Sequence, residues 1–479
     1  MRLLPVRPGL CSLLFLLLGT TLSLDLAAQQ AGSLDAADFD TTCAACRDFF
    51  QFANGGWLKR TVIPGDQPAW GGFNELQEQN YQELQEVLDQ AAAQATKTQD
   101  PGTHRLGTFY GACMDTVRIE AAGAAPLATD LKAIAGVRSR RAVQQTLARL
   151  ARYQISVPFS FHSTPDLKNS SRVIAEVTQS GLGLPDRDYY TREDSASQAL
   201  RVQYTDHIGR MLRLLGDDSA AAARSAQTIL ALETVLARAS MTQVQLRDPD
   251  STYHLTRLAD LQKLTPAFSW NAYLGDLGQR GVTEANVGQP AFLREVDSIY
   301  RATPVDDWKT YLRWHLLTNS AAALSRPFDT ENFRFKSTVL QGISEMRPRW
   351  KRCLARTDDA MGELLGQAYV AQHFTPEAKA KALDMVHNIL AEFRHRLTAL
   401  EWMTDATKTK AYAKLDAIVT KIGYPDRWRD YSRLPVEPDA FLANLHHATV
   451  FEVARDLSKI GKPLDRAEWP FSPPTVNAG

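Results

Sequence analysis

Neither sign of charge is in excess in this chain. Lysine and arginine together number 54, and aspartate and glutamate also number 54, among 479 residues. Proteins that bind the phosphate backbone of nucleic acids usually carry a basic excess, so the balance argues against a dedicated nucleic-acid partner. Hydrophobic residues make up 44% and charged residues 23%, which is typical of a globular protein with a large core.

Cysteine is scarce. Of the five residues, Cys11 falls in an apolar N-terminal stretch, which leaves Cys43, Cys46, Cys113 and Cys353. The first two of these four form a C-x-x-C, but no second C-x-x-C and no histidine pair accompanies it, which argues against a zinc ribbon or a redox motif. An even number of cysteines in an oxidising compartment favours disulfides, so we interpret all four as structural.

Compact catalytic signatures are also missing. The sequence contains no G-x-x-x-x-G-K-[ST] phosphate loop, no G-x-S-x-G nucleophile elbow and no G-x-G-x-x-G. The dipeptide His-Glu does not occur among the ten histidines, so there is no H-E-x-x-H. A helical zinc peptidase site needs two imidazoles one turn apart and a glutamate beside them as base. The sequence therefore predicts no catalytic residue and no metal ligand in this chain.

The first residues have the pattern of a secretory signal. Arg2 and Arg7 precede an apolar stretch over 10–24, and small alanines follow that stretch. The apolar run is shorter than the ~20 residues that cross a bilayer. We expect a signal peptide at 1–31 and a secreted or periplasmic protein. An uncleaved signal would instead anchor the protein to a membrane.

Apolar residues recur at helical spacing over most of the remaining chain. Leu76, Tyr81, Leu84, Leu88 and Ala91 form one such stripe among glutamate and glutamine residues. The same periodicity predicts helices over 141–154, 196–215, 220–239, 308–324, 350–372, 376–403 and 441–460. The predicted fold is therefore mainly α.

Two short segments alternate apolar and polar residues instead. They cover 155–162 and 172–177 and flank a turn rich in proline, asparagine and serine. This pattern predicts a short β-hairpin. Pro158 lacks an N–H, which favours an edge position for the first strand. A helix start is also visible at Thr375-Pro376, where a capping threonine precedes a proline at the first helical position.

Three polar clusters are candidate sites, each with a structural alternative that we favour. Glu392 and His395 stand at the i, i+3 spacing of carboxylate-bridged metal bundles, but no second such pair is present. His446 and His447 are adjacent and point to different helix faces, so one ion would not easily bind both. The cluster D-R-D-Y-Y at 186–190 is expected to fasten a loop onto a helix start rather than to bind a ligand.

Seven stretches with distinctive sequences follow one another along the chain. They are C-R-D-F-F-Q-F-A-N-G-G-W-L at 46–58 followed by V-I-P at 62–64, F-Y-G-A-C-M-D at 109–115, G-L-P-D-R-D-Y-Y at 183–190, R-W-K-R-C at 349–353, T-K-T-K-A at 407–411, K-I-G-Y-P-D-R-W-R-D-Y-S at 421–432, and the stretch 469–478. In this order they resemble the neprilysin and endothelin-converting-enzyme family of zinc metallopeptidases.

The resemblance implies a zinc endopeptidase with two mainly helical lobes around a cavity. One lobe of such an enzyme holds the zinc site, and the other screens access so that peptides and small proteins enter. Residues 55–409 are then expected to form the large helical screening lobe, with the β-hairpin. Residues 32–54 and 410–479 are expected to be incomplete portions of the catalytic lobe.

The resemblance also implies roles for individual cysteines. Cys113 and Cys353 match two family cysteines that pair with each other, and their bridge would close a long loop. Cys46 matches a cysteine whose family partner lies beyond the matched stretches. It is therefore expected to be free or paired with Cys43.

Asn477 and Ala478 match the family's edge-strand motif, which hydrogen-bonds the backbone of a bound substrate by β-augmentation. In the family the zinc motif and the remaining catalytic residues follow this point. Zinc is thus expected in the full-length family, whereas this chain is expected to bind no zinc and to be inactive alone. Peptide substrates are the expected partners. The alternatives are a non-catalytic peptide-binding protein and a truncated or frameshifted product.

Overall fold

The computed structural model describes residues 35–477, so the predicted signal peptide and Ala478 lie outside the described residues. The chain divides into two compact units, of which the first ends at Pro64 and the second begins at Gly65. Each unit is described separately below. Among the described residues, every helix is too short or too polar to cross a bilayer.

The first unit contains a 3-10 turn, η1 (Ala36–Asp38), and the helix α1 (Phe49–Arg60). The helix begins at Phe49 because the Asp48 carboxylate accepts a hydrogen bond from the backbone N–H of Gln51, at 2.9 Å. Cys43 and Cys46 both lie in this unit as free thiols. They are not paired with each other, which decides between the two states expected for Cys46.

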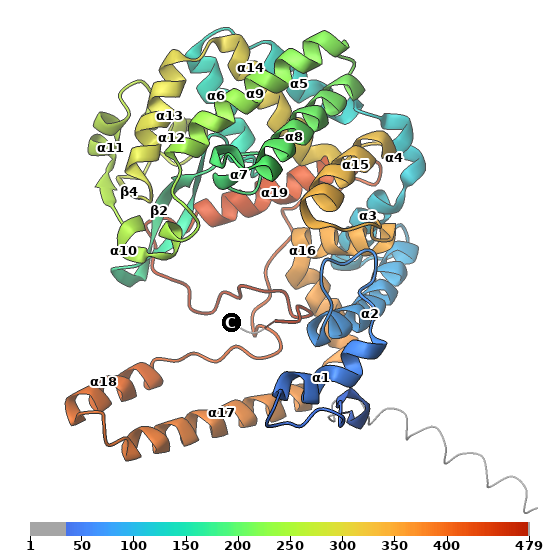
Figure 1. Cartoon of the computed structure of the whole chain (residues 1–479), viewed down its shortest axis with the longest axis vertical. Helices are drawn as coiled ribbons and strands as arrows, with labels where there is room; N and C mark the ends of the chain where they lie inside the picture. The colour runs from blue at the N-terminus through green and yellow to red at the C-terminus, as the bar shows by residue number, and fades with distance from the viewer. Residues whose placement is uncertain (1–34, 478–479) are drawn as a thin grey trace, which may run out of the picture. The chain divides into compact units, whose positions relative to one another are not determined.

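The second unit is built mainly from helices, which confirms the predicted fold class (Figure 1). Its first helices are α2 (Gly72–Gln94), α3 (Pro101–Met114), α4 (Thr116–Ala122), α5 (Ala128–Ala135), α6 (Arg140–Ala151), α7 (Asp188–Thr191), α8 (Ser195–Leu214) and α9 (Ser219–Ala239). The middle helices are α10 (Pro249–Thr252), α11 (Leu258–Leu264), α12 (Trp270–Asp276), α13 (Pro290–Ala302), α14 (Val305–Ser320) and α15 (Arg326–Phe333). The last are α16 (Arg349–His373), α17 (Pro376–Ala399), α18 (Asp405–Asp416) and α19 (Phe441–Leu457).

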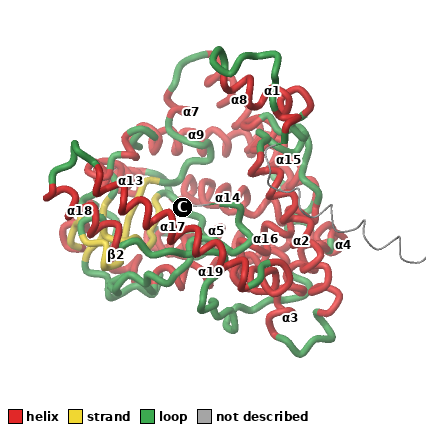
Figure 2. Tube along the Cα trace, turned by 90° about the horizontal axis from the view of Figure 1, so that it is seen from below, coloured by secondary structure: helices red, strands yellow, loops and turns green. Residues whose placement is uncertain are grey.

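One small sheet lies among these helices, and Figure 2 shows its strands in yellow. Its strands are β1 (Phe159–Asp166), β2 (Asn169–Gln179), β3 (Leu255–Arg257) and β4 (Glu284–Val287), in the order β1-β2-β4-β3. β1 and β2 form the predicted antiparallel hairpin, and β1 is an edge strand, as Pro158 indicated. The parallel pairing of β2 with β4 was not predicted.

The core of the second unit is rich in aromatic side chains. Trp308 and Trp314 of α14 and Trp270 of α12 are each 1% exposed. On the neighbouring sheet, Val177 and Val287 are fully buried. Side chains of this size make the largest contributions to burial, at ~25 cal/mol per Å² of apolar surface. The sheet and the α14 region therefore form a well-buried part of the core of this unit.

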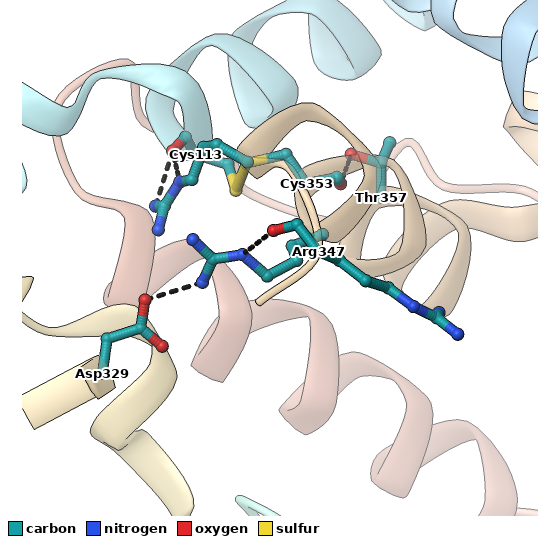
Figure 3. Close-up of a disulfide and its surroundings, with 7 residues drawn as sticks. Cys113, Asp329, Arg347, Cys353 and Thr357 are labelled. Carbon is teal, nitrogen blue, oxygen red and sulfur yellow. Dashed lines mark hydrogen bonds and ion pairs between the residues drawn. A yellow bond between two sulfur atoms is a disulfide. The ribbon is translucent and has the colours of Figure 1, made fainter. Parts of the chain in front are cut away.

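A second part of this core joins α2, α3 and α16. A disulfide between Cys113 of α3 and Cys353 of α16 links helices 240 positions apart in the sequence (Figure 3). α19 packs on the same part of the core, because Phe441 is 5% exposed and its ring lies edge-on to Phe109, with centroids 6.2 Å apart. α19 thus packs in the core of the second unit, although it lies beyond residue 409, where the expected screening lobe ends.

Several predicted details differ from the structure. The helix predicted over 376–403 ends at Ala399, because Leu400 has an extended backbone. The helix predicted over 141–154 ends at Ala151, and Gln154 has a φ of 57°, in the left-handed region. Leu76, predicted to lie on the buried stripe of α2, is 53% exposed.

Candidate substrate-binding furrow

Three adjoining cavities lie between α16, α19 and the chain that follows α19. Their volumes are about 450, 650 and 430 Å³, and we call them the basic, central and outer cavities. The basic and central cavities share five lining residues, namely Gln154, Arg356, Asp359, Leu445 and Thr449. The central and outer cavities share Glu363, Arg429 and Trp469. Because of these shared walls, the three form one furrow, which we call the α16–α19 furrow.

Ion pairs hold the two walls of the furrow together. The Arg429 guanidinium lies 3.0 Å from Glu363 of α16 and 3.0 Å from Glu452 of α19. It therefore bridges the two helices. Farther along, Lys459, just after the end of α19, lies 2.7 Å from Glu468 in the following segment. Burial would raise the pKa of Glu468, but Lys459 and Arg455 hold it below its usual range.

The floor of the central cavity contains two carboxyl groups with raised pKa values. Asp358 and Asp359 lie just before Met361, where α16 is kinked and the backbone has φ −144° and ψ 41°. Burial raises the pKa of Asp358 to about 6 and that of Asp359 in the same direction. Carboxyls perturbed in this way within a cavity mark candidate functional sites, although structural positions show them too.

The segment that ends at Asn477 is packed on α16 and α2. A Cβ at Gly366 of α16 would lie 2.4 Å from Pro473, so only glycine permits this approach. The side-chain amide of Asn80 on α2 donates a hydrogen bond of 2.9 Å to the carbonyl of Pro474. Thr475, two residues before Asn477, lines the central cavity. The packing therefore places the residues just before the predicted substrate-binding motif at the furrow.

The predicted site residues are found as follows. Asn477 is exposed, and its backbone N–H donates to the carbonyl of Thr475 at 3.0 Å. Residues 475–477 form no strand in the described part of the chain, and Ala478 lies beyond it. The binding role of this pair therefore stays a prediction. Cys113 and Cys353 form a disulfide, and Cys113 also lines the basic cavity.

In each of the two weaker candidate pairs, one member has a structural partner. Glu392 pairs with Arg396 at 2.9 Å, and both side chains are more than half exposed. His446 stacks on Tyr153, with ring centroids 4.1 Å apart, and burial lowers its pKa. These contacts are those of ordinary surface and packing residues.

The cluster at 186–190 fastens its loop to the C-terminal half of α9, whereas the prediction was attachment to a helix start. The Arg187 guanidinium donates to the carbonyl of Ala237 at 3.3 Å. The Tyr190 hydroxyl donates to the buried carboxylate of Glu233 at 2.7 Å and accepts the N–H of Leu184 at 2.8 Å. The cluster is therefore a structural joint in the described structure.

The described residues do not fit a zinc site. Across 35–477, no group of three or more His, Cys, Asp or Glu side chains is arranged to hold a metal ion. The sequence also lacks H-E-x-x-H. No chemical step through a metal follows from these side chains.

The residues of the furrow were not recognised as a site in the sequence. Those of the central cavity, for example, come from positions around 154, 356–363, 429, 445–452 and 469–475, which are far apart along the chain. One local signal was available. The string R-P-R-W-K-R at 347–352 places four cations next to one another, and all four line the basic cavity.

The fold is similar to that of a zinc metalloprotease. The chain matches the crystal structure of Mycobacterium tuberculosis zinc metalloprotease Zmp1 in complex with an inhibitor, with a TM-score of 0.86 and 33% identity, over 93% of this chain and 67% of that one. The cryo-EM structure of Zmp1 in an open state matches with a TM-score of 0.80 and 34% identity, over 90% of this chain and 67% of that one.

The sequence comparisons identify the family. The model of Peptidase family M13 matches residues 45–425. Endothelin-converting enzyme 1 of Rattus norvegicus is 30% identical over 460 residues, which are 92% of this chain and 59% of the relative. Endothelin-converting enzyme-like 1 of the same organism is 30% identical over 475 residues, 94% of this chain and 60% of the relative. This chain belongs to peptidase family M13, the neprilysin and endothelin-converting-enzyme family. It spans about three-fifths of the length of these relatives.

Proposed function

We propose that this chain is the N-terminal region of a secreted, neprilysin-like zinc metalloendopeptidase that acts on peptides. The observation that carries the proposal is the agreement with Zmp1, at a TM-score of 0.86 over 93% of the chain. The names of the relatives, an endothelin-converting enzyme and a zinc metalloprotease, support peptide substrates and a zinc cofactor for the whole enzyme.

In this proposal the chain binds and screens peptides, and the residues that cleave them are elsewhere. Residues 55–409 are the screening lobe, and 32–54 and 410–479 contribute to the catalytic lobe. The α16–α19 furrow is the surface on which a peptide lies. The segment that ends at Asn477 offers backbone groups to that peptide by β-augmentation. Without the zinc motif, the 479-residue chain binds peptides but does not hydrolyse them.

The test uses the purified 479-residue chain, with zinc content measured by atomic absorption and peptide binding by fluorescence anisotropy. Cleavage of a quenched fluorogenic peptide is followed with and without a chelator. The expected result is saturable peptide binding, no stoichiometric zinc and no chelator-sensitive cleavage. Stoichiometric zinc together with chelator-sensitive cleavage would overturn the proposed inactivity. Absence of binding by a panel of peptides would overturn the screening role.

Secretion is tested separately by expression of the chain with and without residues 1–31. The extracytoplasmic fraction should contain the protein only when these residues are present. Equal amounts of both forms in the cytoplasm would contradict the proposed location.

A further inference from the structure

Most of the charged side chains that line the basic cavity are basic. Its basic lining residues are Arg347, Arg349, Lys351, Arg352 and Arg356. Asp359 is the acidic residue in the same lining. The whole chain carries equal numbers of basic and acidic residues, so this local excess is not a consequence of composition. Figure 3 shows Arg347 and Asp329 beside the disulfide at this end of the furrow.

Three of these cations already have a carboxylate partner. Lys351 pairs with Glu78. Arg352 pairs with Asp329 at 2.6 Å. Because each of these pairs is close to neutral, they set the shape of the cavity more than its charge.

The third pair is looser. Arg356 lies 3.5 Å from Asp359, and the two side chains are 50% and 69% exposed. Such an exposed pair contributes at most ~1 kcal/mol, so a better acceptor can replace it at small cost.

Two cations in the lining have only neutral acceptors. The Arg347 guanidinium donates to the side-chain carbonyl of Gln67 at 2.8 Å. The Arg349 guanidinium donates twice to the backbone carbonyl of Cys113, at 3.0 and 2.7 Å. Both arginines are half-buried, and a half-buried charge without a counter-charge is costly. Together they leave a positive potential in the cavity that an anion would satisfy.

A buried hydroxyl supplies an independent sign of a missing ligand. Ser320 lines the same cavity and is 3% exposed, and its Oγ has no hydrogen-bond partner in the described structure. Buried polar groups are normally satisfied, so an orphaned hydroxyl in a polar cavity indicates an acceptor or donor that is supplied from outside. Phe441 and Leu442 form an apolar wall of this cavity, which lowers the local dielectric and strengthens charge interactions.

We propose that the basic cavity is an anion subsite of the furrow, which takes the carboxylate side chain of a bound peptide and makes the protein selective for acidic peptides. The inference rests on the proposed function, because it assumes that a peptide lies along the α16–α19 furrow. Arg347 and Arg349 provide the charge, and guanidinium groups suit carboxylates because they donate in a fork. The Ser320 hydroxyl is a third donor.

The position of the cavity explains how a peptide reaches it. The basic and central cavities share walls formed by Gln154 and Thr449, and Thr475 lines the central cavity. A peptide that follows the segment before Asn477 therefore lies in the central cavity, which adjoins the cations of the basic cavity. A volume of about 450 Å³ is ample for one glutamate side chain with its water shell.

The experiment measures the affinity of the full chain for two labelled peptides that differ only by Glu-to-Gln replacements, both with amidated C-termini. Fluorescence anisotropy should show about tenfold tighter binding of the Glu peptide, the value for one hydrogen-bonded charge interaction. Arg347→Gln should remove most of that preference, because the Glu peptide then loses a charged partner in the basic cavity. If Arg347→Gln does not fold, Arg356→Gln provides the same test with a more exposed cation.

Arg394→Gln is the matched control, because Arg394 is 47% exposed on α17 and does not line the furrow. It should keep the full preference. Equal binding of the two peptides by the wild-type chain overturns the inference alone, whereas binding of neither peptide overturns the proposed function as well. Loss of preference in the control would also overturn the subsite. Inorganic phosphate is titrated in parallel. Phosphate binding that Arg347→Gln abolishes, without any preference between the peptides, would assign the cavity to a free anion and overturn the peptide role.

Discussion

The side-chain amide of Asn80 and the backbone carbonyl of Pro474 are joined by a hydrogen bond of 2.9 Å, although 394 positions separate them in the sequence. Pro473 packs on Gly366 next to this bond. The segment before Asn477 is therefore held from two sides. In the proposed mode of binding, this edge of the furrow is already ordered, so the protein loses little conformational entropy when a peptide aligns there.

Replacement of Asn80 by alanine should loosen this edge. The free energy of unfolding should fall by only ~1 kcal/mol, the typical value of one hydrogen bond, because the helices remain packed. Hydrogen exchange at residues 475–477 should become faster, as mass spectrometry can measure. Asn388→Ala on the exposed face of α17 is the control and should leave exchange at 475–477 unchanged. Unchanged exchange in the Asn80 variant would show that the bond does not order the segment.

The disulfide should contribute strongly to stability. Cys113 and Cys353 are 240 positions apart, and in the chain-entropy model a loop of this length stabilises the folded state by ~5 kcal/mol. The double variant Cys113→Ala/Cys353→Ala should lower the urea midpoint accordingly. Cys43→Ala/Cys46→Ala changes two free thiols and should leave the midpoint unchanged. A similar midpoint for both double variants would contradict the structural role of the bridge.

Glu233 should be the most sensitive carboxylate in the core. It is fully buried and accepts hydrogen bonds from Tyr190 at 2.7 Å and Tyr204 at 2.9 Å. Glu233→Ala would leave these hydroxyls without their acceptor, so we expect a loss of ~3–5 kcal/mol in the free energy of unfolding. Glu193→Ala, at a side chain that is 80% exposed, is the control and should change it by under ~0.5 kcal/mol. Equal urea midpoints for the two variants would refute the role of Glu233.

The stability of the protein should depend on pH through Asp358. Burial raises its pKa from 3.8 to about 6, so the folded state holds this proton more tightly than the unfolded chain does. The stabilisation from protonated Asp358 is thus complete below pH 3.8 and is lost as the pH rises through about 6. At pH 8, the free energy of unfolding of Asp358→Asn should therefore exceed that of the wild type by on the order of 1 kcal/mol, and its melting temperature should be higher. At pH 4 the two proteins should melt at nearly the same temperature.

The control for this comparison is Asp426→Asn, because Asp426 is 98% exposed. At pH 8, the melting temperature of Asp426→Asn should be no higher than that of the wild type. A wild-type protein that is as stable as Asp358→Asn at both pH values would contradict the raised pKa.

Much of the helical architecture could be predicted from the sequence, because local patterns determine it. The start of α17 was visible in Thr375-Pro376, and the Thr375 hydroxyl does cap the helix by accepting the N–H of Ala378 at 3.2 Å. The hairpin was visible because β1 and β2 are consecutive and long enough to show alternation. β3 and β4 span only three and four residues, too few for a periodic signal. Their pairing depends on tertiary packing that no local pattern records.

The furrow could not be predicted in the same way. Its walls combine Arg429 with Glu363 and Glu452, which are remote from one another in sequence. Only the fold brings such groups to one surface. The resemblance indicated a binding role for Asn477 and Ala478. It also included three of the cations, in R-W-K-R-C at 349–353, but gave them no binding role. Their excess has meaning only once the structure shows which of them lack a carboxylate partner.

The bridge between Cys113 and Cys353 has a consequence for how the chain withstands proteolysis. The backbone between the two cysteines and the disulfide itself together form a covalent ring that contains the whole sheet and α4 to α15. A single cut anywhere in this ring leaves both fragments attached to each other. A cut between Cys353 and α17, in contrast, breaks the covalent link to the piece that carries α17, α18 and α19, and only noncovalent packing such as that of Phe441 on Phe109 then holds it. Under oxidising conditions, one cleavage within the ring therefore leaves the protein in one covalent piece. One cleavage in the chain that follows Cys353 does not.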